Sequence, residues 1–344
     1  MAEATILPTQ APAPALAQRV RALTGIQPSG ELHLGNYLGA LRNWVAMCRS
    51  HEMFTCIVDY HALTSPLDTE QLAGQTLEMA LAILAAGFDP HEGTIFVQSQ
   101  VPEVTELTWI LVTITPMGEL ERMTQFKDKA SRQSSVLAGL FVYPVLQAAD
   151  ILIYKAKAVP VGEDQVQHVE LTREIARKFN LAFGETFPEP EAVVPALGGR
   201  IRGLDGKAKM SKSLGNTISL LEPPASAWEK LRTAVTDPAR LRRSDPGDPS
   251  KCNIFTLHQN FSPHATTQMI DTECRRAGIG CVDCKKLLFS HLDAELAPMR
   301  ERAAALRAQP EQVREILDHG AQRARKAAQA TMAEVRDKVG FYRP

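Results

Sequence analysis

The chain has 344 residues, a net charge of −1 and 44% hydrophobic residues, which predicts about two domains with a sizeable core. No run of roughly 18 or more apolar residues occurs, which excludes a membrane-spanning helix. Residues 1–18 are rich in Ala and Pro and contain no Lys or Arg, unlike a signal or transit peptide. We therefore expect a disordered tail, no membrane partner and a cytoplasmic location.

The charge is distributed unevenly along the chain. Residues 1–200 carry a net charge of −8, whereas residues 201–344 carry +7. An acidic first part and a basic second part favour a catalytic region followed by a region that contacts RNA. The alternative is that the basic residues only form solvated helix faces.

A glycine- and proline-rich turn near the start of the chain is the first candidate site. Residues 20–23 are mostly apolar and predict a strand, residues 24–33 (TGIQPSGELH) predict a turn, and a helical pattern runs from Leu34 to about Cys48. Free N–H groups at such a helix start favour phosphates. His33 and Asn36 are three residues apart, so both can face that ligand. The alternative is an ordinary turn with a buried histidine.

Strands and helices then alternate. Residues 54–59 and 93–98 predict two further strands, and residues 70–86 between them predict a helix. This alternation indicates an α/β fold with a doubly wound parallel sheet, whose ligands bind beyond the carboxyl ends of the strands. His61 lies just past one such end.

An acidic residue interrupts a very apolar helix. Residues 144–154 predict this helix, with Pro144 in its first turn and Asp150 among apolar neighbours. A buried carboxylate needs a hydrogen-bond donor, because without one its burial costs several kcal/mol, roughly. The donor could be the indole N–H of a substrate, unless Asp150 forms an internal ion pair or faces solvent.

Two later stretches also suit a phosphate ligand. A strand ends at Val161 and a helix carries Gln165 onward, so Gly162, Glu163 and Asp164 lie at a helix start. Residues 207–216 (KAKMSKSLGN) form a basic loop of small residues, which suits a clamp on a polyphosphate. Alone, this loop could equally be solvated.

Together these stretches resemble a known family. HLGN at 33–36 and KMSKS at 209–213 resemble the two signatures of class I aminoacyl-tRNA synthetases. Residues 143–152 resemble the amino-acid pocket of the tryptophanyl branch of that family, in which an Asp binds the indole nitrogen. Two positions depart from the pattern: Asn36 replaces a usual His, and Gln147 replaces a Met that is frequent in bacterial members.

The resemblance implies a reaction and its partners. L-Tryptophan would be activated by ATP with Mg²⁺, then transferred to the 2′-OH of the terminal adenosine of tRNA(Trp), by a homodimer. It also implies a Rossmann-type catalytic domain over residues 19–202, with 309–344 packing back on it, and an α-helical anticodon-side domain over 203–308.

The resemblance assigns roles to individual residues. The implied catalytic residues are His33, Asn36, Lys209 and Lys212. The residues implied for ATP binding are Gln27, Pro28, Ser29, Gly35, Asn36, Gly162, Glu163, Asp164, Ile201, Lys209, Met210, Ser211, Lys212 and Ser213. Those implied for tryptophan binding are Asp150, Tyr143, Gln165, His61 and Gln147.

Four of the six cysteines form a candidate metal set. Cys252, Cys274, Cys281 and Cys284 are separated by 21, 6 and 2 residues. The last pair has the spacing of a metal knuckle, and disulfides are rare in cytosolic enzymes. Four thiolates suit Zn²⁺ or a [4Fe–4S] cluster. The spacing resembles an iron–sulfur subgroup of tryptophanyl-tRNA synthetases whose first gap is one residue longer, so we expect the cluster, with zinc as the alternative.

Three alternative functions remain from the sequence. A tyrosyl-type synthetase would share the fold but would not explain Asp150. A catalytically inactive synthetase-fold RNA-binding protein would not need the intact 209–213 motif. A nucleotidyltransferase acting on a small molecule would not need the basic helical second part.

Overall fold

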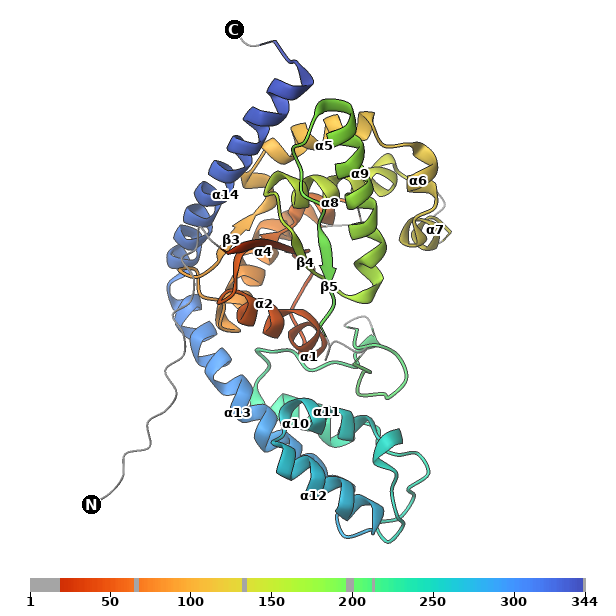
Figure 1. Ribbon diagram of the computed structural model, residues 1–344. Coiled ribbons are helices and arrows are strands. Elements are labelled where there is room, and N and C mark those ends of the chain that lie inside the picture. The colour runs from red at the N-terminus through yellow and green to blue at the C-terminus, as the bar shows by residue number, and fades with distance from the viewer. Residues whose placement is uncertain (1–18, 65–67, 132–134, 196–200, 212–213, 343–344) are drawn as a thin grey trace, which may run out of the picture.

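The structure, a computed structural model, describes residues 19–64, 68–131, 135–195, 201–211 and 214–342. Within these residues one parallel sheet has the strand order β3-β2-β1-β4-β5 (Figure 1). The strands are β1 (Val20–Ile26), β2 (His51–Ile57), β3 (Thr94–Val97), β4 (Ala158–Pro160) and β5 (Glu191–Val193). The predicted α/β doubly wound fold is therefore confirmed.

Strand β1 occupies the centre of the sheet. It pairs with β2 over its whole length, from Val20 opposite His51 to Ile26 opposite Ile57, and with β4 at Ala22. The strand order reverses between β1 and β4. In a sheet of this kind the crevice at that reversal, outside the carboxyl ends of the strands, is where ligands bind.

Helices cover both faces of the sheet and continue into a helical region. The helices of the first part are α1 (Leu34–Asn36), a π-helical turn (Tyr37–Leu41), α2 (Arg42–Met47), α3 (Asp59–Ala62), α4 (Thr69–Ala85), α5 (Glu103–Thr113), α6 (Met117–Glu121), α7 (Thr124–Ala130), α8 (Ala138–Ile153) and α9 (Val166–Phe183). Short 3₁₀ turns are η3 (Gln98–Gln100), η4 (Glu163–Gln165) and η6 (Pro249–Lys251). The later helices are α10 (Pro224–Thr233), α11 (Asn253–Phe261), α12 (His264–Arg275), α13 (Cys281–Ala308) and α14 (Pro310–Val339). None of the described helices is long and apolar enough to span a membrane.

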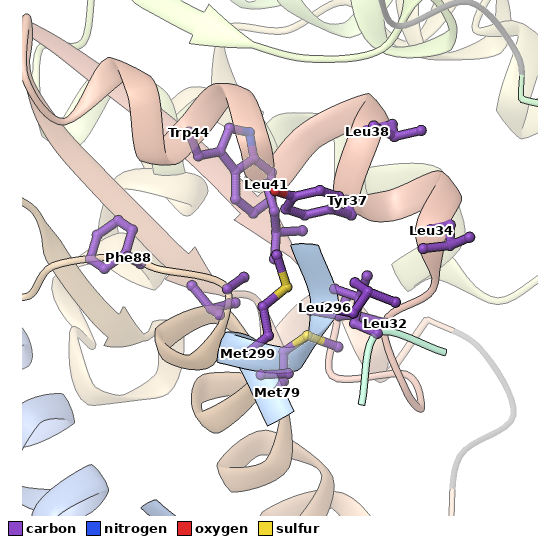
Figure 2. Packing of buried hydrophobic residues seen from close by; sticks show 14 of the residues in the cluster. Leu32, Leu34, Tyr37, Leu38, Leu41, Trp44, Met79, Phe88, Leu296 and Met299 are labelled. Atoms are coloured by element: carbon purple, nitrogen blue, oxygen red, sulfur yellow. The ribbon is translucent and has the colours of Figure 1, made fainter. Parts of the chain in front are cut away.

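Two apolar cores lie on the two faces of the sheet. On one face, Leu34 and Trp44 pack with Met79 of α4 and with Leu296 and Met299 of α13 (Figure 2). The core of the other face is built by α5, α8, α9 and α14. Because both faces are covered, β3 is buried throughout and β2 is buried over its last five residues, as parallel strands usually are.

Two predicted helices differ in the structure. The prediction of a first helical turn at Pro144 is wrong, because α8 begins at Ala138 and Pro144 lies inside it. The proline removes one backbone hydrogen bond, but burial of Leu140, Tyr143 and Val145 on the same helix offsets that loss. The single helix expected from Leu34 to about Cys48 is interrupted by the π-helical turn, a feature that often occurs beside functional sites.

The last helix lies along the edge strand of the sheet. In Figure 1, α14 passes beside β3, and Gly320 makes the close contact. A Cβ at Gly320 would overlap the carbonyl oxygen of Ile95 in β3. This glycine therefore sets how closely α14 approaches the sheet.

We expect Gly320→Ala to destabilise the protein by about 1–3 kcal/mol, because a backbone atom cannot move aside as a side chain can. The free energy of unfolding in urea measures the change. Gly74→Ala in α4 is the matched control, since nothing lies within 4 Å of its Cβ position. That control should be stabilised by up to about 1 kcal/mol. Equal effects of the two substitutions would contradict the close-contact argument.

Candidate active site

A cavity of about 410 Å³ opens at the carboxyl ends of β1 and β4. Its walls come from both strands, from α8 and from η4, so it lies where the strand order reverses. The predicted site residues that line it are Gln27, His61, Tyr143, Gln147, Asp150, Asp164 and Gln165. The fold thus brings together residues that are up to 138 positions apart in the chain.

Asp150 is a buried carboxyl group in the wall of this cavity, with 4% of its surface exposed. His61 Nε2 donates a hydrogen bond to Oδ2 at 2.8 Å, and Gln98 Nε2 lies 2.8 Å from both Oδ1 and Oδ2. The protein itself thus supplies donors to the carboxylate. Gln98 was missed by the sequence analysis, although it ends the predicted strand 93–98, where site residues gather.

Tyr143 forms the next wall of the cavity. Its hydroxyl lies 2.9 Å from Nε2 of the fully buried His168, and burial raises the pKa of Tyr143 to about 12. The phenol therefore stays neutral at physiological pH and serves as a hydrogen-bonding group. At the cavity's outer rim, Asp164 Oδ2 accepts from Gln125 at 3.2 Å and from Gln165 at 3.0 Å.

The turn that follows β1 is held by its own side chains. His33 Nδ1 accepts from the N–H groups of Gly35 and Asn36 at 3.1 and 3.3 Å, and Asn36 Oδ1 accepts from His33 N at 3.1 Å. This reciprocal pattern is a capping box, which fixes the start of α1. Gln27 Nε2 reaches the carbonyl oxygen of His61 at 3.4 Å, which joins the turn to the cavity wall.

Backbone pairing joins this turn to the chain that follows the basic loop. Leu34 N donates to Ile218 O at 3.0 Å, and Leu220 N donates to Leu32 O at 2.9 Å. A Cβ at Gly35 would lie 3.0 Å from the His33 ring and 3.3 Å from the Met210 Cβ, both tight contacts, so a glycine here favours the close approach of the two motifs. The structure therefore brings the two motifs that the sequence separates by more than 170 residues into contact.

The basic loop itself is anchored by Asn216. Its side chain accepts from Ser211 N at 2.8 Å and donates to Asp205 and to the carbonyl of Lys209. Met210 is buried, whereas Lys209 is exposed. The predicted site residues Lys212 and Ser213 lie outside the described residues.

The remaining predicted ATP-binding residues do not line the 410 Å³ cavity. Pro28 and Ile201 are buried, whereas Ser29, Gly162 and Glu163 are exposed near the ends of β1 and β4. His33 borders a separate cavity of about 340 Å³ with Gly215 and Thr217.

The four cysteines predicted to bind a metal lie close together in the helical region. Burial and the neighbouring thiols of Cys252, Cys274 and Cys281 raise the pKa of Cys284 to about 12. Among the described residues, however, no group of three or more His, Cys, Asp or Glu side chains is arranged to hold a metal ion. The expectation of a bound metal is therefore not supported by the arrangement of these side chains, which lack the converging geometry that a zinc ion requires.

Comparison with known proteins agrees with these features. Residues 16–297 match the family model described as tRNA synthetases class I (W and Y). The chain is 56% identical to a tryptophan–tRNA ligase of Deinococcus radiodurans, over 93% of this chain and 98% of the relative. It is 44% identical to that of Thermotoga maritima, over 92% and 98%.

A solved structure of a tryptophanyl-tRNA synthetase is also similar to this chain. The crystal structure of tryptophanyl-tRNA synthetase from Campylobacter jejuni, complexed with ADP and tryptophan, matches with a TM-score of 0.85 and 42% identity. The match covers 93% of this chain and all of that chain. The chain therefore belongs to the class I tRNA synthetases of the tryptophan and tyrosine family, among relatives that are tryptophan–tRNA ligases.

Proposed function

We propose that this chain activates L-tryptophan with ATP to tryptophanyl-adenylate and transfers the amino acid to tRNA(Trp) in the cytoplasm. The observation that carries the proposal is the Asp150 carboxylate, buried in the wall of a cavity of about 410 Å³. That volume lies in the range of small-ligand sites. The 56% identity to a tryptophan–tRNA ligase supports the same choice of amino acid.

Recognition of tryptophan depends on one polar contact at a buried carboxylate in the cavity wall. Asp150 accepts the indole N–H, while His61, Tyr143, Gln147 and Gln165 surround the rest of the amino acid. Phenylalanine has no donor for that carboxylate. A site that hydrogen-bonds its substrate rejects an analogue without the donor strongly. It rejects an analogue that lacks only a methylene group far less strongly.

The chemistry needs positioning more than covalent catalysis. A carboxylate oxygen of tryptophan attacks the α-phosphorus of ATP, and the bond from that phosphorus to the bridging oxygen breaks to release pyrophosphate. His33, Asn36, Lys209 and Lys212 stabilise the charge that develops on the phosphates. ATP reacts as its Mg²⁺ complex, and the attacking group needs no general base because it is already ionised.

We assign ATP binding to the turn and loops around these groups. The residues are Gln27, Pro28, Ser29, Gly35, Asn36, Gly162, Glu163, Asp164, Ile201, Lys209, Met210, Ser211, Lys212 and Ser213. Contact between Gly35 and Met210 supports this assignment, because it lets both motifs act on one nucleotide.

Transfer to tRNA completes the reaction. The terminal ribose 2′-OH attacks the carbonyl carbon of the adenylate, the bond to the phosphate oxygen breaks, and AMP leaves. We assign the tRNA contacts beyond the acceptor end to the basic helical region, residues 203–308, with residues 19–202 and 309–344 forming the catalytic domain. Residues 203–308 carry 16 Lys and Arg against 12 Asp and Glu, a net charge of +4, which supports this division.

We also propose a [4Fe–4S] cluster at the four cysteines, with a structural role or a role in anticodon binding. Cys252, Cys274, Cys281 and Cys284 would hold such a cluster through their sulfurs. Cys252 precedes α11, Cys274 lies on α12, and Cys281 and Cys284 lie in the first turn of α13, so three neighbouring helices carry the set. The chemistry of four cysteine sulfurs fits iron–sulfur ligation.

A homodimer through the catalytic domain is the last part of the proposal. Leu63, Trp109 and Leu137 are large apolar side chains that are 58%, 69% and 69% exposed. A shallow apolar cavity of about 290 Å³ lies beside them, between α3, α5 and α8. Exposed apolar surface of this kind marks a protein interface.

The first test concerns the tryptophan pocket. We expect Asp150→Ala to lower kcat/KM for tryptophan by about a hundredfold or more in ATP–pyrophosphate exchange, because a hydrogen bond to a charged group is lost. Unchanged tryptophan affinity would contradict the assignment. Exchange by the unmodified protein with tyrosine instead would favour the tyrosyl alternative, and no exchange at all would favour an inactive RNA-binding protein.

The second test concerns the cysteines. Protein purified without oxygen should show a broad brown absorption band that is lost in Cys281→Ser. Cys48→Ala is the matched control, since Cys48 is a buried thiol outside the set and its removal should leave the band unchanged. Colourless protein would exclude the cluster but leave the synthetase proposal intact.

The third test concerns the dimer. We expect Trp109→Glu to convert the dimer to a monomer in sedimentation experiments, since a charge would be buried at the interface. Leu181→Glu is the control, because Leu181 is 91% exposed on α9 and lies outside the proposed face. A dimer that persists in Trp109→Glu would place the interface elsewhere.

A further inference from the structure

Gln98 is a buried amide that the proposed mechanism does not use. It follows β3 directly as the first residue of η3, and only 1% of its surface is exposed. Its Nε2 lies 2.8 Å from both oxygens of Asp150, and its Oε1 accepts from Tyr60 N at 3.1 Å. Gln98 therefore joins the start of α3 to the carboxylate on α8.

The hydrogen bonds determine which way the amide points. The backbone N–H of Tyr60 can only donate, so the oxygen of the Gln98 amide must face it. The NH₂ group then faces Asp150, where both carboxylate oxygens accept. The reverse orientation would leave an amide oxygen against a carboxylate and a donor against a donor.

This amide holds the plane of the carboxylate. His61 hydrogen-bonds only to Oδ2, and with that bond alone the carboxyl group could still rotate. Gln98 hydrogen-bonds to both oxygens and therefore restricts that rotation. Oδ2 thus has two contacts with these donors and Oδ1 has one. Oδ1 consequently has the larger remaining capacity to accept a donor from the cavity.

We propose that Gln98 is the positioning residue that orients Asp150 Oδ1 toward the indole N–H and so sets the preference for tryptophan over analogues without that donor. The inference depends on the proposed function, in which Asp150 accepts the indole N–H. Gln98 does not itself touch the reacting atoms; it acts through the carboxylate.

The test compares tryptophan with an isostere in which sulfur replaces the indole N–H, β-(3-benzothienyl)-L-alanine. The measured quantity is the ratio of kcat/KM for the two amino acids in ATP–pyrophosphate exchange by the full chain. A merely structural role of Gln98 would lower both values together and leave this ratio unchanged. The ratio therefore reports only on the contact made by the N–H group.

Two variants remove the Gln98 donor in different ways. Gln98→Met keeps the length of the side chain, and Tyr60 N retains Asp59 Oδ1 as an acceptor at 3.1 Å. Gln98→Leu removes the amide with a shorter apolar side chain, so it decides the question if the Met variant does not fold. Gln100→Met is the matched control, because Gln100 lies on the same turn and donates to Asp318 outside the cavity at 2.9 Å.

We expect both Gln98 variants to lower the ratio by about tenfold, as loss of orientation weakens one charged hydrogen bond, and Gln100→Met to leave it unchanged. If Asp150→Ala loses the preference but the Gln98 variants keep it, the positioning role is overturned while the pocket assignment stands. If Asp150→Ala keeps the preference, the pocket assignment itself fails, and this inference fails with it.

Discussion

The proposed tryptophan site is arranged around one requirement, which is that the buried carboxylate of Asp150 needs hydrogen-bond donors. Asp150 lies in a helix whose neighbours are almost all apolar, and α3 and η3 bring the donors His61 and Gln98 to it. Those donors leave the carboxylate oriented before any ligand arrives. A preorganised, buried acceptor favours a ligand with a matching donor, because little reorganisation is needed on binding.

The nucleotide side depends on a different constraint, the close approach of two backbone segments. The turn at His33 is stiffened by its own capping box, and short antiparallel pairing ties it to residues 218–220. Gly35 has no Cβ that would crowd the His33 ring and Met210, so the two segments can lie close together. Phosphate stabilisation of the proposed kind requires groups from both segments around one ligand, and this contact supplies the geometry for it.

The strands and helices could be predicted from the sequence more readily than the contacts between them. The alternation of strands and helices predicted the parallel sheet, and an isolated Asp in an apolar helix predicted a buried polar site. The partner at Gln98 was missed because it lies 52 residues from Asp150, and nothing local to the strand reveals which distant charge its amide meets. The helix start predicted at Pro144 is wrong because burial of the apolar side chains around it outweighed the preference of proline for a first helical turn. The roles of the individual ATP-binding residues stay predictions.

A single helix links the turn that carries His33 to the cysteine set. Helix α13 begins at Cys281, and about 21 Å further along, Glu295 accepts a hydrogen bond of 2.6 Å from the Tyr37 hydroxyl. Tyr37 directly follows Asn36 and opens the π-helical turn. Burial and Glu295 raise the pKa of Tyr37, so the phenol remains a donor throughout the physiological range. The position of the helical region is thus coupled, through one hydrogen bond and the core around Leu296, to the turn that carries His33.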